Sequence, residues 1–276
     1  ILTSNPGFKD AANGDFTLDA ASEQNINKTG DPRWLVIVKA GSVAYLCGAT
    51  ETNEAIYNAL VAADYDVTPL NYDNVTLTEE IVNNDFAGKY DVVVLAGATG
   101  SGTNLAKSAN MLLGKVNVLS TKSFWYKHYG TNGTNPGSAD NPSINMVKTV
   151  AAHPIFTGIE GDEFAVFNVM EDRTSGRYLQ GNGSFADETL AQTSLGSTNG
   201  SDCIGEVWVG EYGYVIIPVD GAQPEGYLTE DGKQLFVNAV KYLVDGVKYE
   251  IPTGIDGVNA TVNVLNGDIY TINGVK

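Results

Sequence analysis

The chain has 276 residues, of which 43% are hydrophobic, so it is long and apolar enough to bury a large core. Its 16 Lys and Arg residues stand against 33 Asp and Glu residues. The resulting formal net charge of −17 would repel both a nucleic-acid backbone and an anionic membrane surface. No apolar run approaches the roughly 20 residues that span a bilayer. We therefore expect a globular protein with no membrane-spanning segment and no nucleic-acid partner.

The cysteines and histidines are too few for a disulfide framework or a zinc site. Cys47 and Cys203 either form one disulfide or remain as two buried thiols, and the sequence leaves both open. His128 and His153 complete no metal-ligand spacing with them. We therefore expect neither a metal nor a cofactor.

Residues 1–33 are predicted to form an N-terminal arm distinct from the main domain. Turn signals at 5–7 and 12–15 flank a short strand at 16–18. A segment this small cannot bury its own apolar residues. It is therefore either an arm packed on the main domain or the remnant of an upstream module.

Residues 34–250 alternate between strands and helices, which predicts a parallel sheet with right-handed crossovers. The expected elements up to residue 120 are a strand at 42–47, a helix at 52–64, a strand at 65–70, a helix opened by a capping box at 76–79, a strand at 90–96, a helix at 103–113 and a strand at 116–119. Thr50 is the expected N-cap of the first helix, with Glu51 and Glu54 as favourable charges near its positive end. Pro69 places its strand nearer an edge.

Beyond residue 120 the alternation fails. A Gly- and Asn-rich loop covers 130–142. Strands are expected at 164–169, 188–193, 204–210 and 213–219, the last two forming a hairpin that turns near Glu211, and a helix at 229–245. A β-rich tail covers 251–276. The predicted class is α/β: a flavodoxin-like parallel sheet with helices on both faces, an added antiparallel hairpin and small β-rich terminal segments.

Four stretches of the main domain resemble the flavodoxin-like domains of the class I glutamine amidotransferase-like superfamily, particularly ThuA-like proteins. They are residues 91–97, 153–159, 206–218 and 235–243. The resemblance implies a hydrolase or isomerase that acts on a small sugar derivative in a crevice at the strand ends. However, the nucleophile motif Gly-x-Cys-x-Gly of that superfamily is absent, since the stretch around Cys203 lacks its first glycine. No catalytic residue can therefore be carried over.

Both ends of the chain also carry resemblances. Residues 5–18 and 30–34 resemble the closing segment of pectate-lyase-like β-helix modules in secreted Bacteroidetes polysaccharide-processing proteins. Residues 267–276 resemble the C-terminal signature of exported proteins of that group, although a simple terminal hairpin also fits. These resemblances imply an upstream domain of a longer chain, and export to the periplasm, the cell surface or the medium.

The glycine-rich turn after the strand at 90–96 matches no phosphate-binding motif. A dinucleotide fingerprint needs a third glycine where Leu105 stands, and a P-loop needs a lysine where Thr103 stands. A plain tight turn and a small-anion site formed by backbone amides both remain open. We expect this turn to form one wall of the crevice, with Thr99 and Ser101 among the ligand-binding residues.

The stretch 122–129 follows the next strand and should emerge at the same crevice. Its polar and aromatic residues suit a sugar, since aromatic faces cover sugar rings and lysines pair with uronate carboxylates. The predicted ligand-binding residues here are Lys122, Ser123, Trp125, Tyr126 and His128. The alternative is that these aromatics cover the core beneath the 130–142 loop.

Three other groups have structural explanations. Cys47 ends a strand beside the crevice, but the neighbouring acids disfavour a thiolate, so we expect a core residue rather than a nucleophile. His153 precedes Pro154 and is expected to be a helix-terminal structural histidine. Glu206 and Glu211 flank the hairpin with no identifiable second carboxylate.

The sequence therefore leaves three hypotheses. The first is an accessory, non-catalytic domain of an exported carbohydrate-processing protein that binds a pectin-like sugar. The second is a ThuA-like hydrolase or isomerase. The third is a structural spacer without a ligand.

Overall fold

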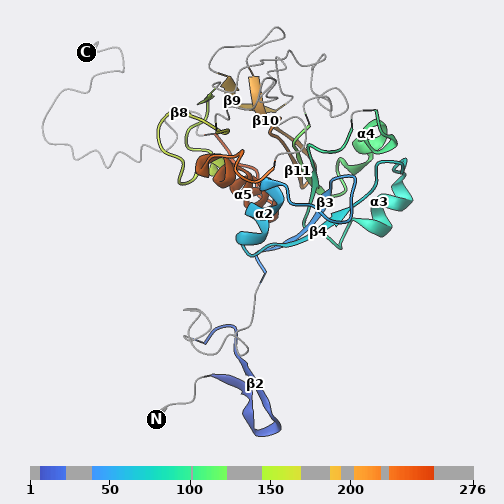
Figure 1. Ribbon diagram of the computed structural model, residues 1–276, viewed down its shortest axis with the longest axis vertical. Helices are drawn as coiled ribbons and strands as arrows, with labels where there is room; N and C mark the ends of the chain where they lie inside the picture. Colours follow the sequence, from blue (N-terminus) through green and yellow to red (C-terminus); the bar gives the residue numbers. More distant parts are fainter. Residues whose placement is uncertain are drawn as a thin grey trace, which may run out of the picture.

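The computed structural model describes residues 7–22, 39–100, 102–122, 145–168, 187–193, 202–218 and 224–251. The strands of its large sheet are β3 (Ser42–Leu46), β4 (Asp66–Leu70), β5 (Val92–Leu95), β6 (Asn117–Ser120), β7 (Met146–Lys148), β8 (Glu163–Phe164), β9 (Glu188–Thr193), β10 (Asp202–Val209) and β11 (Tyr212–Ile216). The helices around it are α2 (Ala55–Ala62), α3 (Glu79–Asp85), α4 (Asn104–Ser108) and α5 (Glu230–Asp245), with short 3-10 turns η3 (Ala109–Leu112) and η5 (Pro154–Phe156) (Figure 1).

One half of the sheet is parallel. The strand order is β4-β3-β5-β6-β11-β10-β9-β7-β8, and the first five strands all run in one direction. The order second, first, third, fourth along the chain is that of flavodoxin-like sheets. The predicted α/β class is therefore confirmed by the strand order itself.

The other half is antiparallel. The predicted hairpin forms between β10 and β11, and β11 extends the parallel half by pairing with β6. Strands β9, β7 and β8 follow in antiparallel order. The prediction missed β7, which has only three residues, and the strand expected at 164–169 is reduced to the two residues of β8.

Helices cover both faces of the parallel half. The four residues of β5 are buried, as the unbroken apolar run predicts for a strand covered on both sides. Helices α2 and α5 pack together over one face, and α3 and α4 cover the other (Figure 1). Each face has its own cluster of buried apolar residues.

Two predicted helix starts are wrong. Helix α2 begins at Ala55, not 52, and its N-cap is Glu54 rather than Thr50. Helix α3 begins after Thr78, whose hydroxyl accepts from the backbone N–H of Ile81, so the predicted capping box at 76–79 does not form. In both cases several residues are needed to carry the chain from the strand to the helix before the first turn begins.

The N-terminal part forms a small sheet of its own. Strands β1 (Phe8–Asp10) and β2 (Asp15–Leu18), joined by the 3-10 turn η1 (Ala11–Asn13), pair in antiparallel fashion. The strand expected at 16–18 is part of β2. The whole 130–142 loop and the tail after residue 251 lie outside the described residues. Among the described helices, none has both the length and the apolar character that crossing a membrane requires.

Candidate functional site

The parallel strands end level with one another, which defines an edge where loops meet. Leu46 of β3 is in register with Leu70 of β4 and Leu95 of β5, and Leu95 with Ser120 of β6. After β3 the chain turns to α2 on one face, whereas after β5 it turns to α4 on the other. In open α/β sheets, ligands usually bind outside the carboxyl ends of the strands, where the loops diverge in this way. We call this region the carboxyl-end site.

Glu54 is the central polar residue of the carboxyl-end site. It lies at the start of α2, bridges to Pro224 and is only 5% exposed. Its Oε2 accepts a hydrogen bond of 2.6 Å from the Tyr45 hydroxyl. Its Oε1 is buried and forms no hydrogen bond with the described residues.

Burial raises the pKa of Glu54 above its usual value. The Tyr45 hydrogen bond, the charge of Lys122 and the Ala98 backbone amide act in the opposite direction but do not cancel the effect. The Ala98 amide thus points toward the carboxylate without making a hydrogen bond of ordinary geometry to Oε1. A carboxyl in this state has an open acceptor position and holds a proton more readily than an exposed one.

Lys122, one of the predicted ligand-binding residues, belongs to this site. It follows β6, is only 6% exposed, and its charge acts on Glu54. Thr99, a second predicted residue, is fully buried, and its hydroxyl donates to the carbonyl oxygen of Leu46 at 3.1 Å. Thr121 makes the equivalent bond to Leu95. The two threonines therefore tie adjacent strand ends together beneath the site.

Asp73 lies beyond the end of β4 on the other side of the same edge. Its Oδ1 is buried and has no hydrogen bond among the described residues. A Cβ on Gly48 would lie 2.8 Å from Asp73 Oδ2, and Gly48 has a φ of +73°, so this close approach requires glycine. The carboxyl-end site thus contains a second acceptor without a partner among the described residues.

The amides at the start of α4 are already occupied. The backbone N–H groups of Asn104 and Leu105 donate to the carbonyl oxygen of Asp73, and that of Ala106 donates to the Thr103 hydroxyl. These three groups are not available to an anion. The bonds agree with a plain capped turn at this position.

Neither cysteine is suited to nucleophilic chemistry. Burial raises the pKa of the Cys47 thiol, and Glu54 adds to the effect, while its Sγ donates to the carbonyl oxygen of Ala49. Burial also raises the pKa of Cys203, which lies within the core and donates to Ala191. Both cysteines are buried and neither is in a disulfide, so the disulfide alternative does not apply.

A second polar cluster lies beneath α5, around Glu206 of β10. Glu206 does not flank the hairpin but pairs within it, opposite Val215. Its Oε2 accepts hydrogen bonds from Trp208 Nε1 and the Tyr242 hydroxyl, both at 2.8 Å. His153 Nε2 lies 3.8 Å from the same oxygen, too far for a hydrogen bond but close enough for attraction.

Hydrogen bonding in this second cluster lowers the pKa of Glu206. Burial alone would raise it, but His153, Trp208 and Tyr242 outweigh that effect. His153 Nδ1 accepts from the backbone N–H of Ile155 at the start of η5, so the predicted helix-terminal role is confirmed. We interpret the cluster as structural, because its groups are directed at one another.

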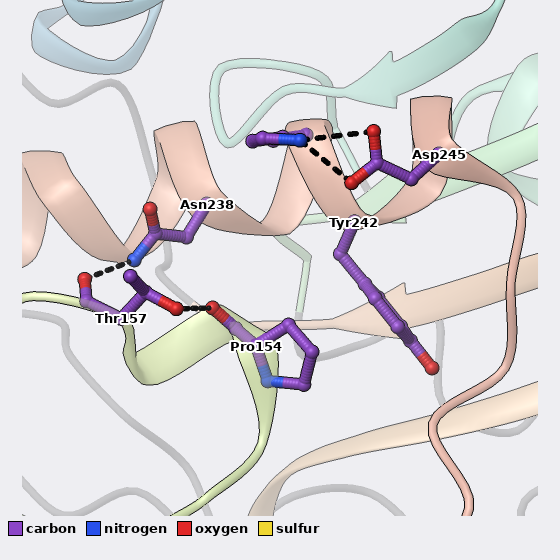
Figure 2. Close-up of a pocket in the computed structure, with 6 residues that line it drawn as sticks. Pro154, Thr157, Asn238, Tyr242 and Asp245 are labelled. Carbon is purple, nitrogen blue, oxygen red and sulfur yellow. Dashed lines mark hydrogen bonds and ion pairs between the residues drawn. The ribbon is translucent and has the colours of Figure 1, made fainter.

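A small pocket lies beside this cluster, and polar groups that line it are already paired with one another or with nearby backbone groups (Figure 2). Its volume is about 120 Å³. Asn238 Nδ2 donates to the carbonyl oxygen of Thr157 (Figure 2) and to that of Ile155. Lys241 pairs with Asp245 at 2.7 Å. These partners leave few polar groups free to orient a ligand.

Several predicted site residues cannot be placed. Ser101, Ser123, Trp125, Tyr126 and His128 lie outside the described residues. Of the predicted set, the described structure therefore places Lys122 beside Glu54 and Thr99 beneath it. Within the described part of the chain, no group of three or more His, Cys, Asp or Glu residues is arranged to hold a metal ion.

Sequence reasoning missed Glu54 and Asp73 as site residues. The sequence indicates for Glu54 only a favourable charge near the end of a helix. The alternating pattern does predict that both follow strand ends, but not that an oxygen of each would lack a partner among the described residues.

Comparisons with known proteins give no family. No protein-family model matches the chain, and no curated protein matches its sequence. Among solved structures, it is similar to a Thermoplasma acidophilum protein that is described as a subunit of a GMP synthase. The TM-score is 0.45 at 12% sequence identity, over 74% of this chain and 94% of the other protein. At these values the likeness carries no argument about activity, and the fold class rests on the strand order.

Proposed function

We propose that this chain is an accessory, non-catalytic domain of an exported polysaccharide-processing protein, and that it binds carbohydrate at the carboxyl-end site. The observation that carries the binding proposal is the buried Glu54 Oε1, which has no hydrogen bond among the described residues. The export and the accessory role rest on the sequence resemblances at the two ends of the chain.

The chemistry of the site suits a sugar. A buried acceptor without a partner costs about 1–3 kcal/mol, and a ligand hydroxyl that donates to it would recover that cost. Sugars present adjacent hydroxyls that both donate and accept. Glu54, at the start of α2, supplies an acceptor, and Lys122, after β6, is a donor whose charge acts on Glu54. Trp125 and Tyr126, predicted from the sequence, would add faces for the ring.

The proposal of a non-catalytic role is supported by the state of the thiols. Reactive cysteines are thiolates stabilised by positive charge, whereas the pKa of Cys47 is raised by burial and by Glu54. Cys203 lies within the core and its pKa is raised as well. Neither matches the activated nucleophile of the superfamily that the sequence resembles.

A second function is favoured by one specific observation. Burial raises the pKa of Glu54 toward the range in which a carboxyl exchanges protons efficiently. A hydrolase or isomerase acting on a small sugar derivative would need such a group.

Calorimetric titration of the chain with neutral and acidic plant oligosaccharides tests the first proposal. We expect binding that weakens about 10- to 100-fold in Glu54→Gln and in Lys122→Met, as for loss of a hydrogen bond to a charged group. Glu79→Gln is the control, because Glu79 pairs with Lys115 on the surface. Absence of binding to every sugar would refute the proposal.

Turnover of a panel of sugar derivatives tests the second candidate function, that of a hydrolase or isomerase. The enzyme alternative requires measurable turnover that Glu54→Gln abolishes and Glu79→Gln leaves unchanged. Turnover that persists in Glu54→Gln would exclude Glu54 as the proton-transfer group.

A further inference from the structure

At the carboxyl-end site, the buried side-chain oxygens without a hydrogen bond among the described residues are all carboxyl oxygens. The two buried side-chain oxygens there that form no hydrogen bond with the described residues are Glu54 Oε1 and Asp73 Oδ1, and each belongs to a carboxyl group. An ionised carboxylate accepts hydrogen bonds but cannot donate them. A ligand that satisfies these atoms must therefore offer donors to them.

The charges at the site also disfavour an anionic ligand. Lys122 is the positive group whose charge reaches Glu54, so the two largely offset each other. Asp73 adds negative charge on the other side of the edge, and the chain as a whole carries a formal charge of −17. Among the described residues of this edge, little positive potential therefore remains to attract an anion.

A uronate would meet these groups unfavourably. Its carboxylate is an acceptor only, so against Glu54 Oε1 it would place two like charges in contact where water is excluded. A neutral hexose has a hydroxymethyl group at the same ring position, and its O–H can donate. The two sugars thus differ at this ring position both in charge and in the ability to donate a hydrogen bond to Glu54.

We propose, building on the sugar-binding function above, that the carboxyl-end site selects neutral sugars over hexuronates, with ligand hydroxyls donating to Glu54 Oε1. This narrows the pectin-like ligand expected from the sequence to its neutral portions, such as galactan side chains, rather than its acidic backbone. Lys122 then serves to hold Glu54 ionised and oriented, not to pair with a uronate.

Matched oligosaccharides test this selectivity directly. Calorimetry at pH 7 should compare oligogalactosides with oligogalacturonates of equal length, together with the methyl-esterified form of the latter. We expect the neutral sugar to bind at least 10-fold more tightly than the acid, and the ester to recover part of the difference. Equal or tighter binding of the uronate would overturn the inference while leaving sugar binding intact. Binding of neither would instead refute the proposed function.

The Glu54→Gln variant separates charge from shape. Glutamine keeps an acceptor oxygen at nearly the same place but removes the negative charge. We expect the preference for the neutral sugar to fall below 3-fold in Glu54→Gln and to remain unchanged in Glu225→Gln, an exposed glutamate that pairs with Asn58 and Lys233. An unchanged preference in Glu54→Gln would contradict the inference.

Acidification provides a second measurement on the unaltered protein. As the pH is lowered from 7, protonation of Glu54 should strengthen uronate binding, because burial raises the pKa of Glu54, whereas a galacturonate stays ionised down to about pH 3.5, the usual range of an α-carboxyl group. Of the groups facing Glu54, Tyr45 and Cys47 stay neutral because burial raises the pKa of each, and Lys122 supplies the positive charge. Uronate binding that weakens on acidification would contradict the inference.

Discussion

Two buried glutamates in this protein occupy opposite situations. Glu206 is 1% exposed and receives two hydrogen bonds, with His153 also directed at it, so its pKa is lowered. Glu54 is 5% exposed, receives a hydrogen bond from Tyr45, and its pKa is raised. Burial is nearly equal, so the supply of donors decides the difference.

The difference separates a structural group from a candidate ligand group. Around Glu206 the hydrogen-bond donors come from β10 and α5, and His153 before η5 lies 3.8 Å away, so the carboxylate holds these parts together. Around Glu54 the described residues leave one acceptor position open at the edge where the parallel strands end. Buried polar groups without partners are uncommon and often mark functional sites.

The largest expected effect is a loss of stability when Glu206, the structural glutamate, is replaced. Glu206→Ala leaves the donors of Trp208 and Tyr242 buried without an acceptor and removes the charge opposite His153. We expect a loss of about 3–5 kcal/mol in the free energy of unfolding, as for other broken buried networks. Urea denaturation followed by tryptophan fluorescence measures it. A loss below about 1 kcal/mol would mean that the cluster is not structural.

The pH dependence of stability should separate the two glutamates next. The pKa of Glu206 is lowered on folding, so its contribution is present above the unfolded-state value of about 4.3 and is lost as the pH falls through the folded-state value. The pKa of Glu54 is raised, so its contribution is present below about 4.3 and is lost as the pH rises through the folded-state value.

Denaturation at a series of pH values measures both slopes. Glu206→Gln should flatten the loss of stability on acidification, and Glu54→Gln should raise stability mainly at the higher pH values, where Glu54 is ionised in the folded protein. Identical pH profiles for the two variants would show that the two carboxyls do not differ in this way.

A smaller effect is expected at the tyrosine that donates to Glu54. Tyr45→Phe removes the hydroxyl that donates to Glu54 Oε2 and leaves that oxygen buried. We expect a loss of about 1–2 kcal/mol in the free energy of unfolding. Because this bond lowers the pKa of Glu54, the variant should raise that pKa further. Carboxyl-region NMR titration of the glutamate, with Tyr72→Phe as the control, checks the second point.

The smallest expected effect is a gain in stability when Glu54 is replaced by glutamine. Glu54→Gln removes a buried charge whose pKa is unfavourably shifted, so the variant should be equally stable or more stable by up to about 1 kcal/mol. Sugar binding should weaken in the same variant. Stability gained as binding is lost is typical of residues kept for function. A large loss of stability would place Glu54 with Glu206 among the structural groups.

Much of the fold could be predicted from local pattern. The bounds of β9 agree with the predicted strand at 188–193, and α5 begins one residue after its predicted start because Thr229 caps it. In these elements the apolar residues recur with a clear spacing, and recognisable residues such as the N-cap Thr229 mark where the element begins. Strand β7 was missed because three residues are too few to carry a period, and the start of α2 was misplaced because Thr50 does not cap it.

The sequence by itself therefore determined the α/β class, the direction of the parallel strands and the edge at which those strands end. Apolar runs and helical spacing are local properties, and they constrain the sheet without knowledge of distant contacts. Only the tertiary structure decided which polar groups at that edge matter. Glu54 and Glu206 look alike in sequence. They differ because the fold brings Tyr242 and His153, both distant in the chain, to Glu206, while the described residues leave one oxygen of Glu54 without a partner.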